Sequence, residues 1–404
     1  MAQSNVNEKQ INSTAQSDKE AQKTPGKTTE TKQSTSKQLI VVVFILSLAT
    51  KLYLLPIYLI QMTGRDAYIA LSIEVAFDLI ALGLLLAAIM LAGDKSFFEL
   101  LEEVIGKVGA KIFVAFVALF LFFKLNISAA ETSTFYSDNV FADFDAPFMI
   151  IVLLIFLGSV ANHTLRSLCR INELMAPIVA LGIVMLIAIV IATGFDFANI
   201  FPAMRNGLDF RRAMMRNAAW IGDFTPLVLF IGRTKTKKHT AVFAAASGTV
   251  GSAVVVFFGI VLCAAFGNIK NFADSCTNIS NILQFSIGNV YGRIDLLSSI
   301  LWSVSAFIET ALFFYATCRC VEYVIGRNIH FWVGLSLCVI LYFLQVFAMT
   351  DPTIFSTVAS CIPTAVMTPV FAILIPALAL ISAIVVRKRD KKQSEQGSEN
   401  EAEK

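Results

Sequence analysis

Several ionisable side chains of this sequence lie inside runs of apolar residues that are long enough to cross a lipid bilayer. They are Lys51, Glu74, Asp78, Lys124, Asp223 and Glu309. A charge at the centre of a membrane helix costs about 2.5–3.5 kcal/mol on insertion scales, so such residues normally face the bundle interior. For any single residue, an ion pair that only fixes helix packing is an alternative. For the whole set, we expect a polar cavity or a conduction path.

Glu74 and Asp78 are four residues apart and therefore lie on one face of a helix. Two carboxylates so placed repel each other unless one is protonated or a cation sits between them. This spacing suits proton handling. A helical pair neutralised by Lys124 fits the spacing equally well.

Two of the apolar runs are interrupted by small or polar residues, one charge and a proline. The first interruption contains Lys51 and ends at Pro56, and the second contains Asp223 and ends at Pro226. Broken backbone in a membrane leaves polar groups unpaired, which is tolerated only where protein or a water-filled cavity surrounds it. Each proline alone fits a simple kink. The matched positions of the two interruptions favour a transporter-type binding site.

The composition places these interruptions in a membrane protein. The chain has 404 residues, of which 56% are hydrophobic and 15% charged, whereas about a quarter of a soluble domain is charged. Runs of roughly 20 apolar residues recur, each long enough to span the bilayer as a helix. The sequence predicts an all-α polytopic membrane protein and argues against a globular enzyme. The expected spans are residues 38–62, 67–92, 111–135, 147–164, 168–194, 213–232, 240–267, 295–318, 329–349 and 363–386.

These ten spans divide into a 5+5 inverted repeat with helices one and six broken. We expect residues 1–37 to be a disordered cytoplasmic N-terminal tail and residues 38–386 to be the permease-like domain. We expect residues 387–404 to be a charged, disordered cytoplasmic C-terminal tail. The distribution of Lys and Arg among the loops places both termini in the cytoplasm. An amphipathic stretch, residues 97–108, suits a helix lying in the membrane interface.

Other kinds of chemistry lack a signal in the sequence. The 7 cysteines are scattered, and most lie in or beside apolar segments, where they act as small apolar residues. No His, Cys and Asp cluster has the spacing of metal ligands, so we predict no metal and no cofactor. No phosphate-binding loop, catalytic triad or nucleic-acid-binding signature is present, so no nucleic-acid partner is expected.

Four stretches together resemble the spore germination permease family, the B-type subunit of nutrient germinant receptors. This family is a branch of the amino acid–polyamine–organocation transporter superfamily. The resemblance covers residues 38–386 and implies a multi-pass protein of the spore inner membrane. It also implies two partner subunits, a membrane A-type subunit with a large soluble domain and a C-type lipoprotein. The stretches are Leu54-Leu55-Pro56 with Gly64-Arg65-Asp66-Ala67, Asn199-Ile200-Phe201-Pro202, Gly222-Asp223 with Pro226, and Arg293-Ile294-Asp295 through Trp302 to Phe313-Phe314-Tyr315-Ala316.

The chain departs from the family pattern at its charged positions. The family usually has glycines where Ala49 and Lys51 stand, Glu at the position of Asp223, and often Lys at that of Glu309. The resemblance implies that helices one and eight are neighbours beside the substrate site. We therefore hypothesise an ion pair between Lys51 and Glu309.

The resemblance implies a germinant-receptor subunit that binds a small nutrient, an amino acid, and triggers germination, with ion release as one consequence. A second hypothesis is an autonomous proton-coupled amino acid permease, and a third is a structural subunit with a vestigial site. We expect proton or ion-pair roles for Glu74, Asp78, Lys124 and Glu309. The expected substrate-binding residues are Ala49, Thr50, Lys51, Asn126, Gly222, Asp223, Phe224, Thr225, Thr310 and Phe314.

Overall fold

The computed structural model describes residues 36–49, 51–52, 55–139, 146–192, 196–201, 213, 218–234, 238–266, 294–327, 329–350 and 362–402. All of these residues belong to one compact unit, Ser34–Lys404. Residues 1–35 of the predicted N-terminal tail lie outside the described part. So does Thr50 of the predicted substrate site, whereas its neighbours Ala49 and Lys51 are described.

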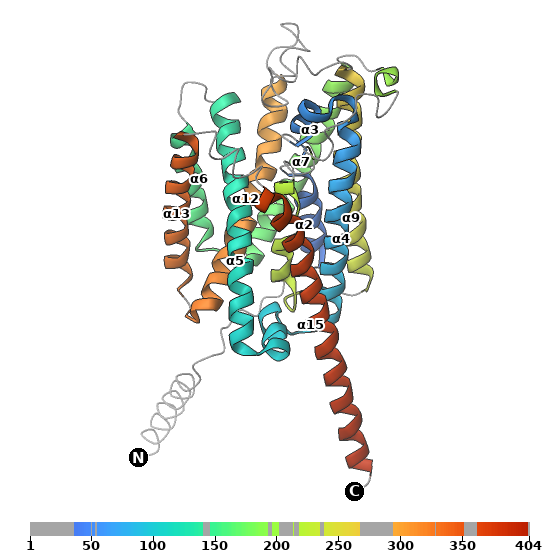
Figure 1. The fold of residues 1–404 in the computed structure, drawn as a ribbon, viewed down its shortest axis with the longest axis vertical. Helices are drawn as coiled ribbons and strands as arrows, with labels where there is room; N and C mark the ends of the chain where they lie inside the picture. Colours follow the sequence, from blue (N-terminus) through green and yellow to red (C-terminus); the bar gives the residue numbers. More distant parts are fainter. Residues whose placement is uncertain are drawn as a thin grey trace, which may run out of the picture. The chain divides into compact units, whose positions relative to one another are not determined.

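The described residues form long helices that run side by side (Figure 1). The α-helices are α2 (Ser36–Leu48), α3 (Leu55–Thr63), α4 (Ala67–Leu91), α5 (Phe97–Asn139), α6 (Ala146–Val160), α7 (Leu165–Ala192), α9 (Lys238–Phe266), α12 (Ile294–Ile325), α13 (His330–Thr350) and α15 (Ile362–Ala402). Four short 3-10 helices lie between them: η1 (Gly64–Asp66), η2 (Phe197–Ile200), η3 (Ala218–Trp220) and η4 (Thr225–Phe230).

The helices account for the predicted membrane spans. In the part of the chain that the structure describes, seven helices are long and apolar enough to cross a bilayer, and three shorter apolar segments join them. The shorter segments are Ser36–Leu48, Phe148–Val160 and Ala218–Phe230. The predicted all-α polytopic fold is confirmed.

The two predicted breaks are present, in the first and the sixth apolar segments. The first segment is divided into α2 and α3, and the sixth into η3 and η4 with a turn over residues 221–224. Pro56 is the second residue of α3 and Pro226 the second of η4. A proline fits the first turn of a helix because the N–H that it lacks has no partner within the helix there. Each proline therefore starts the second half of a broken helix.

Two segments differ from their predicted forms. The amphipathic stretch and the third span are joined in α5, and a non-helical residue, Gly106, at φ 77°, lies near the end of the amphipathic stretch. The predicted disordered tail from residue 387 is instead helical as far as Ala402, at the end of α15. Lys, Arg, Glu and Gln are strong helix formers, and an i,i+4 ion pair between Lys391 and Glu395 supports the extension.

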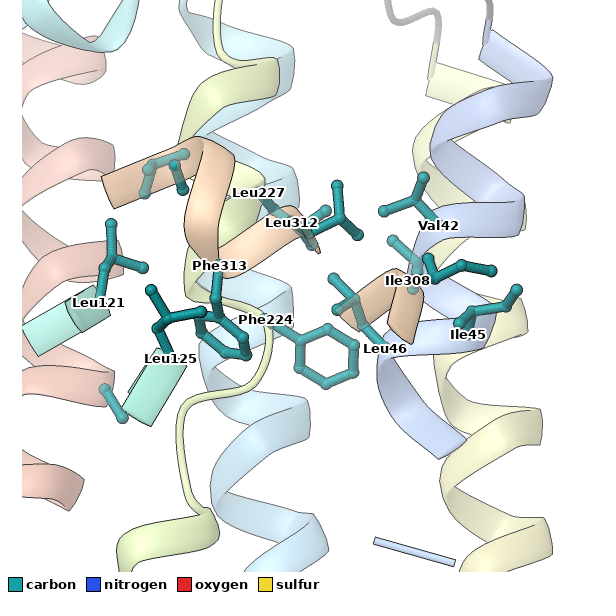
Figure 2. Packing of buried hydrophobic residues seen from close by; sticks show 14 of the residues in the cluster. Val42, Ile45, Leu46, Leu121, Leu125, Phe224, Leu227, Ile308, Leu312 and Phe313 are labelled. Atoms are coloured by element: carbon teal, nitrogen blue, oxygen red, sulfur yellow. The ribbon is translucent and has the colours of Figure 1, made fainter. Parts of the chain in front are cut away.

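The broken segments lie at the centre of the packed helices. α12 is the most buried of the long spans and packs against α5 and α7, while α2 packs against α9 and α7. Figure 2 shows the Phe224 ring at the second break, with Phe313 of α12 on one side and Leu46 of α2 on the other. The outer faces of α6, α7 and α13 expose large apolar side chains, as a lipid-facing surface requires.

Candidate functional site

Four buried side chains of alternating charge link the two breaks to the unbroken helices around them. The Lys51 ammonium pairs with Asp78 of α4 and lies 3.3 Å from the carboxylate of Asp223 in the second break. Asp223 is in turn 2.6 Å from the ammonium of Lys124 on α5. The order is therefore Asp78, Lys51, Asp223, Lys124, and we call this set the charge chain. Its two positive and two negative side chains are all at most 4% exposed.

The two ends of the charge chain also hold backbone groups of the second break. The Gly222 N–H donates to the Asp78 carboxylate over 2.7 Å. The Lys124 ammonium donates to the Ala219 carbonyl oxygen over 2.9 Å. In a membrane these backbone groups have no water to bond, so the charged side chains supply the partners that an unbroken helix would have provided.

Gly222 has the backbone conformation on which this turn depends. Its φ is +100°, a region that residues with a Cβ rarely adopt. A Cβ at this position would also meet Ala372 and Phe120 at 3.0 Å. The glycine therefore permits both the turn and the close approach of α5 and α15.

One face of α5 is directed at the second break and at α12. Lys124, Ser128 and Glu131 are spaced i, i+4 and i+7, so they share one side of the helix. The Ser128 and Thr310 hydroxyls are 2.7 Å apart, which joins α5 to α12. Glu131 accepts a hydrogen bond from the indole N–H of Trp220, the last residue of η3.

The predicted contribution of Asn126 to the substrate site is not supported. Its side chain and its carbonyl oxygen accept hydrogen bonds from Gln345 of α13. Asn126 is two residues from Lys124, which rotates it by about 200° to another side of the helix. Ser128 is the small polar residue of α5 that faces α12.

The charged residues are buried as predicted, but their partners differ from the hypothesis. Lys51 forms ion pairs with Asp78 and Asp223. Lys124 pairs with Asp223 and not with the carboxylates of α4. The second break accounts for this pairing, because the turn places the Asp223 carboxylate between the two lysines.

Glu74 and Glu309 are each buried, on α4 and α12. Glu74 lies on the same face of α4 as Asp78, within electrostatic range of Lys51. The cation that the Glu74 and Asp78 spacing calls for is therefore Lys51. No three His, Cys, Asp or Glu side chains of the described residues are grouped as a metal site would require.

Three of the remaining predicted site residues, Ala49, Phe224 and Thr225, lie at or beside the two breaks. Thr225 donates its hydroxyl to the Gly222 carbonyl and so stabilises the turn. Phe224 is buried in the apolar core, and Ala49 continues the last turn of α2 through its N–H bond to Ile45. The buried Phe314 ring points instead toward Gly334 of α13, whereas its neighbour Phe313 faces the Lys124 ammonium, 5.9 Å from the ring centroid. The structure thus gathers Lys51, Gly222 and their neighbours at one centre.

Sequence reasoning missed Ser128, Glu131 and Trp220. Glu131 lies inside the predicted third span, seven residues after Lys124, so helical spacing placed it on the same face. That spacing was the available signal for both Glu131 and Ser128. Trp220 carried no such signal, because its role depends on where the helix breaks.

A family profile described as spore germination protein matches residues 34–354, which include both breaks. The chain belongs to this family. The resemblance to spore germination permeases is therefore confirmed. No curated protein sequence matches the chain.

Solved structures show which fold this spore germination family member has. The structure of Mhp1 in an inward-facing conformation superposes with a TM-score of 0.53 at 12% identity, covering 90% of this chain and 92% of the other. Mhp1, a nucleobase-cation-symport-1 family transporter, in a closed conformation with bromovinylhydantoin bound gives a TM-score of 0.52 at 11% identity, covering 88% and 91%. At such identities the likeness is one of fold, and the fold is that of a transporter.

Proposed function

We propose that this spore germination family member is the membrane subunit of a germinant receptor. It binds a small nutrient, an amino acid, in mid-membrane between the two breaks. The observation that carries the proposal is the contact of the breaks through Lys51 and Asp223, 3.3 Å apart, in a chain of this family. The protein resides in the spore inner membrane with both termini in the cytoplasm.

The charge chain supports an amino acid, a zwitterion, as the nutrient. The contact between Lys51 and Asp223, at 3.3 Å, is longer than that between Asp223 and Lys124, at 2.6 Å. An amino acid that enters this link places its carboxylate on Lys51 and its ammonium on Asp223. One internal ion pair is then replaced by two, with no change in net charge, while Asp78 and Lys124 remain bound.

The walls of the site come from the residues around this link. Ala49 lies two residues before Lys51 on the first break, and residues 222–225 form the second face. Thr310 on α12 forms the side wall together with Phe313, whose ring faces the Lys124 ammonium, and Ser128 takes the place that was predicted for Asn126.

Entry of the nutrient separates the breaks, because Lys51 and Asp223 are in contact without it. Binding therefore shifts the population toward a conformation with the breaks further apart, by as much as the affinities for the two conformations differ. The consequence is ion release or a signal to the partner subunits, the A-type membrane subunit and the C-type lipoprotein.

A germination screen tests this proposal. A strain that lacks only this chain is exposed to single amino acids, and we expect the response to at least one to be lost. The parent chain restores the response, and so does the control Asp94→Asn, at an exposed position outside the site. Asp223→Asn does not restore it. A strain that keeps every response without the chain overturns the receptor role, and full rescue by Asp223→Asn and Thr310→Ala indicates a vestigial site.

A second candidate function is an autonomous proton-coupled amino acid permease. It is favoured by Glu74, a buried carboxyl beside Lys51 whose Oε1 has no hydrogen-bond partner among the described residues. Uptake of labelled amino acid by the purified chain alone in liposomes, driven by a proton gradient, would establish transport. Absence of uptake with a preserved germination response supports the receptor.

A further inference from the structure

Glu131 is a carboxyl that the charge chain does not neutralise. The two lysines of the chain already face two aspartates. Glu131 is 8% exposed, and its Oε1 accepts the hydrogen bond from Trp220. Its Oε2 has no hydrogen-bond partner among the described residues, and the same residues provide no ion pair. A deprotonated Glu131 is therefore a buried charge without a counter-ion.

The charged groups around Glu131 do not supply that counter-ion. Lys124, on the same helix, is bound to Asp223 and to the Ala219 carbonyl. Asp223 in the break and Glu74 on α4 are the other charged groups acting on Glu131, and both are acidic. Glu309, on the adjoining helix α12, is another buried carboxyl. An isolated buried carboxylate is so unfavourable that such a group normally takes up a proton.

We propose that Glu131 is a proton-binding site, and that its proton occupancy sets how firmly α5 holds the second break. In the protonated form, Oε1 accepts from the Trp220 indole and Oε2 carries the proton. On release, the O–H bond breaks, its electron pair stays on the carboxylate, and the proton passes to water. The indole bond then has an ionised acceptor and becomes stronger.

Trp220 transmits this change because it immediately precedes the turn at residues 221–224. Release of the proton holds η3 against α5, and uptake of the proton loosens it. By linkage, any conformation that separates Trp220 from Glu131 binds the proton more tightly. A proton and a movement of the second break are thus coupled through one hydrogen bond.

The chain contains 3 tryptophans, which makes Trp220 a usable reporter. The substitutions Trp302→Phe and Trp332→Phe leave Trp220 as the sole source of tryptophan emission. We expect its emission in lipid nanodiscs to show a one-proton transition over the pH range in which circular dichroism shows an intact fold. Glu131→Gln abolishes the transition while keeping an oxygen that accepts the indole bond. The control Asp94→Asn, at an exposed position outside the site, retains it.

Infrared spectroscopy provides a second measurement, which would not change if Glu131 had only a structural role. At a pH below the fluorescence transition, the C=O absorption of protonated carboxyls is reduced in Glu131→Gln relative to the parent and is retained in Glu131→Asp. If Glu131→Gln does not fold, a displaced transition in Glu131→Asp serves in its place. A fluorescence transition that survives in Glu131→Gln, the absence of any transition in the parent, or an unchanged infrared band overturns the proposal.

These measurements use no nutrient. Failure of the proton site therefore leaves the proposed nutrient binding untouched, and failure of the germination screen leaves the proton site standing.

Discussion

Two lysines of this protein have nearly the same local geometry in opposite surroundings. Lys51 lies between Asp78 and Asp223 at the centre of the helices. Lys95, between α4 and α5, lies between Glu103 at 3.0 Å and Asp390 at 3.1 Å. The Lys51 side chain is 3% exposed and the Lys95 side chain 34%. Each ammonium has two carboxylate partners, so the comparison isolates the effect of burial.

Burial changes how much the same ion pairs contribute to the stability of the fold. Loss of one partner from a buried ion pair typically costs about 3–5 kcal/mol, because the remaining charge is left in a medium of low polarity. An exposed pair contributes about 0–1 kcal/mol, since water solvates both charges almost as well. The exposed cluster tethers two segments, whereas the buried one fixes the positions of two broken helices. The following predictions test that difference.

Asp223→Ala should have the largest effect on stability. It leaves both Lys51 and Lys124 without their shared carboxylate, so we expect a loss of at least about 3–5 kcal/mol. The measurement is the unfolding temperature of the purified protein in detergent, together with its yield as a monodisperse peak. Asp390→Ala removes a carboxylate from Lys95 and should cost less than about 1 kcal/mol. Equal shifts for the two variants would contradict the comparison.

A double-mutant cycle separates the pairing of Lys51 and Asp78 from their individual burial. Lys51→Met and Asp78→Leu each strand a buried charge, whereas the double variant removes both. We expect the double variant to be more stable than the sum of the single effects predicts, by about 0.5–3 kcal/mol. Recovery stays incomplete because Asp223 also loses Lys51. The same cycle on Lys95 and Asp390 should show coupling near zero, and comparable coupling in both cycles would refute the role of burial.

The sequence allowed the buried cluster to be predicted as a set, but not as pairs. Membrane insertion energetics identify a charge in an apolar run regardless of its partner, which is why Lys51, Asp78 and Asp223 were found. Which ammonium meets which carboxylate depends on how far the chain turns at residues 221–224. That turn brings Asp223 between two lysines, and helical periodicity does not apply across it. The pairing of Lys51 with Asp78 and Asp223 was not predicted for this reason.

Asn126 shows the complementary case, in which periodicity was available. Asn126 was chosen because it is polar and lies inside a span, and its angular position relative to Lys124 was not considered. Helical spacing from Lys124 selects Ser128 and Glu131 instead. Within a helix, the face of a residue is therefore predictable once one member of the site is known.

Gly222→Ala should have an intermediate effect that is specific to the buried cluster. The substitution forces a Cβ into a position with φ +100°, where it meets neighbouring atoms at 3.0 Å. Strained backbone of this kind costs about 1–3 kcal/mol, and the shift weakens the bond from the Gly222 N–H to Asp78. Gly83→Ala is the control, since a Cβ in this helix meets nothing within 4 Å. Thermal unfolding should show a loss for Gly222→Ala and an unchanged or slightly raised stability for Gly83→Ala.

Lys95→Met should have the smallest effect, and its dependence on solution conditions is the informative part. We expect a loss below about 1 kcal/mol, decreasing as salt is added, because screening acts within about 3 Å at 1 M ionic strength. The hydrogen bonds to Glu103 and Asp390 raise the pKa of Lys95 above its usual value. Because the pKa of Lys95 is raised in the folded state, its ion pairs contribute fully to the stability of the fold below the ordinary lysine pKa. That contribution disappears as pH rises through the pKa of Lys95 in the folded state. The stability difference between Lys95→Met and the parent should therefore vanish in alkaline solution and at high salt.

For Lys51→Met the difference should persist at high salt, because ions do not enter the packed centre in which Lys51 lies. A loss that salt removes equally at both positions would mean that the charge chain is reached by solvent, and the buried cluster would then have to be described as a hydrated cavity.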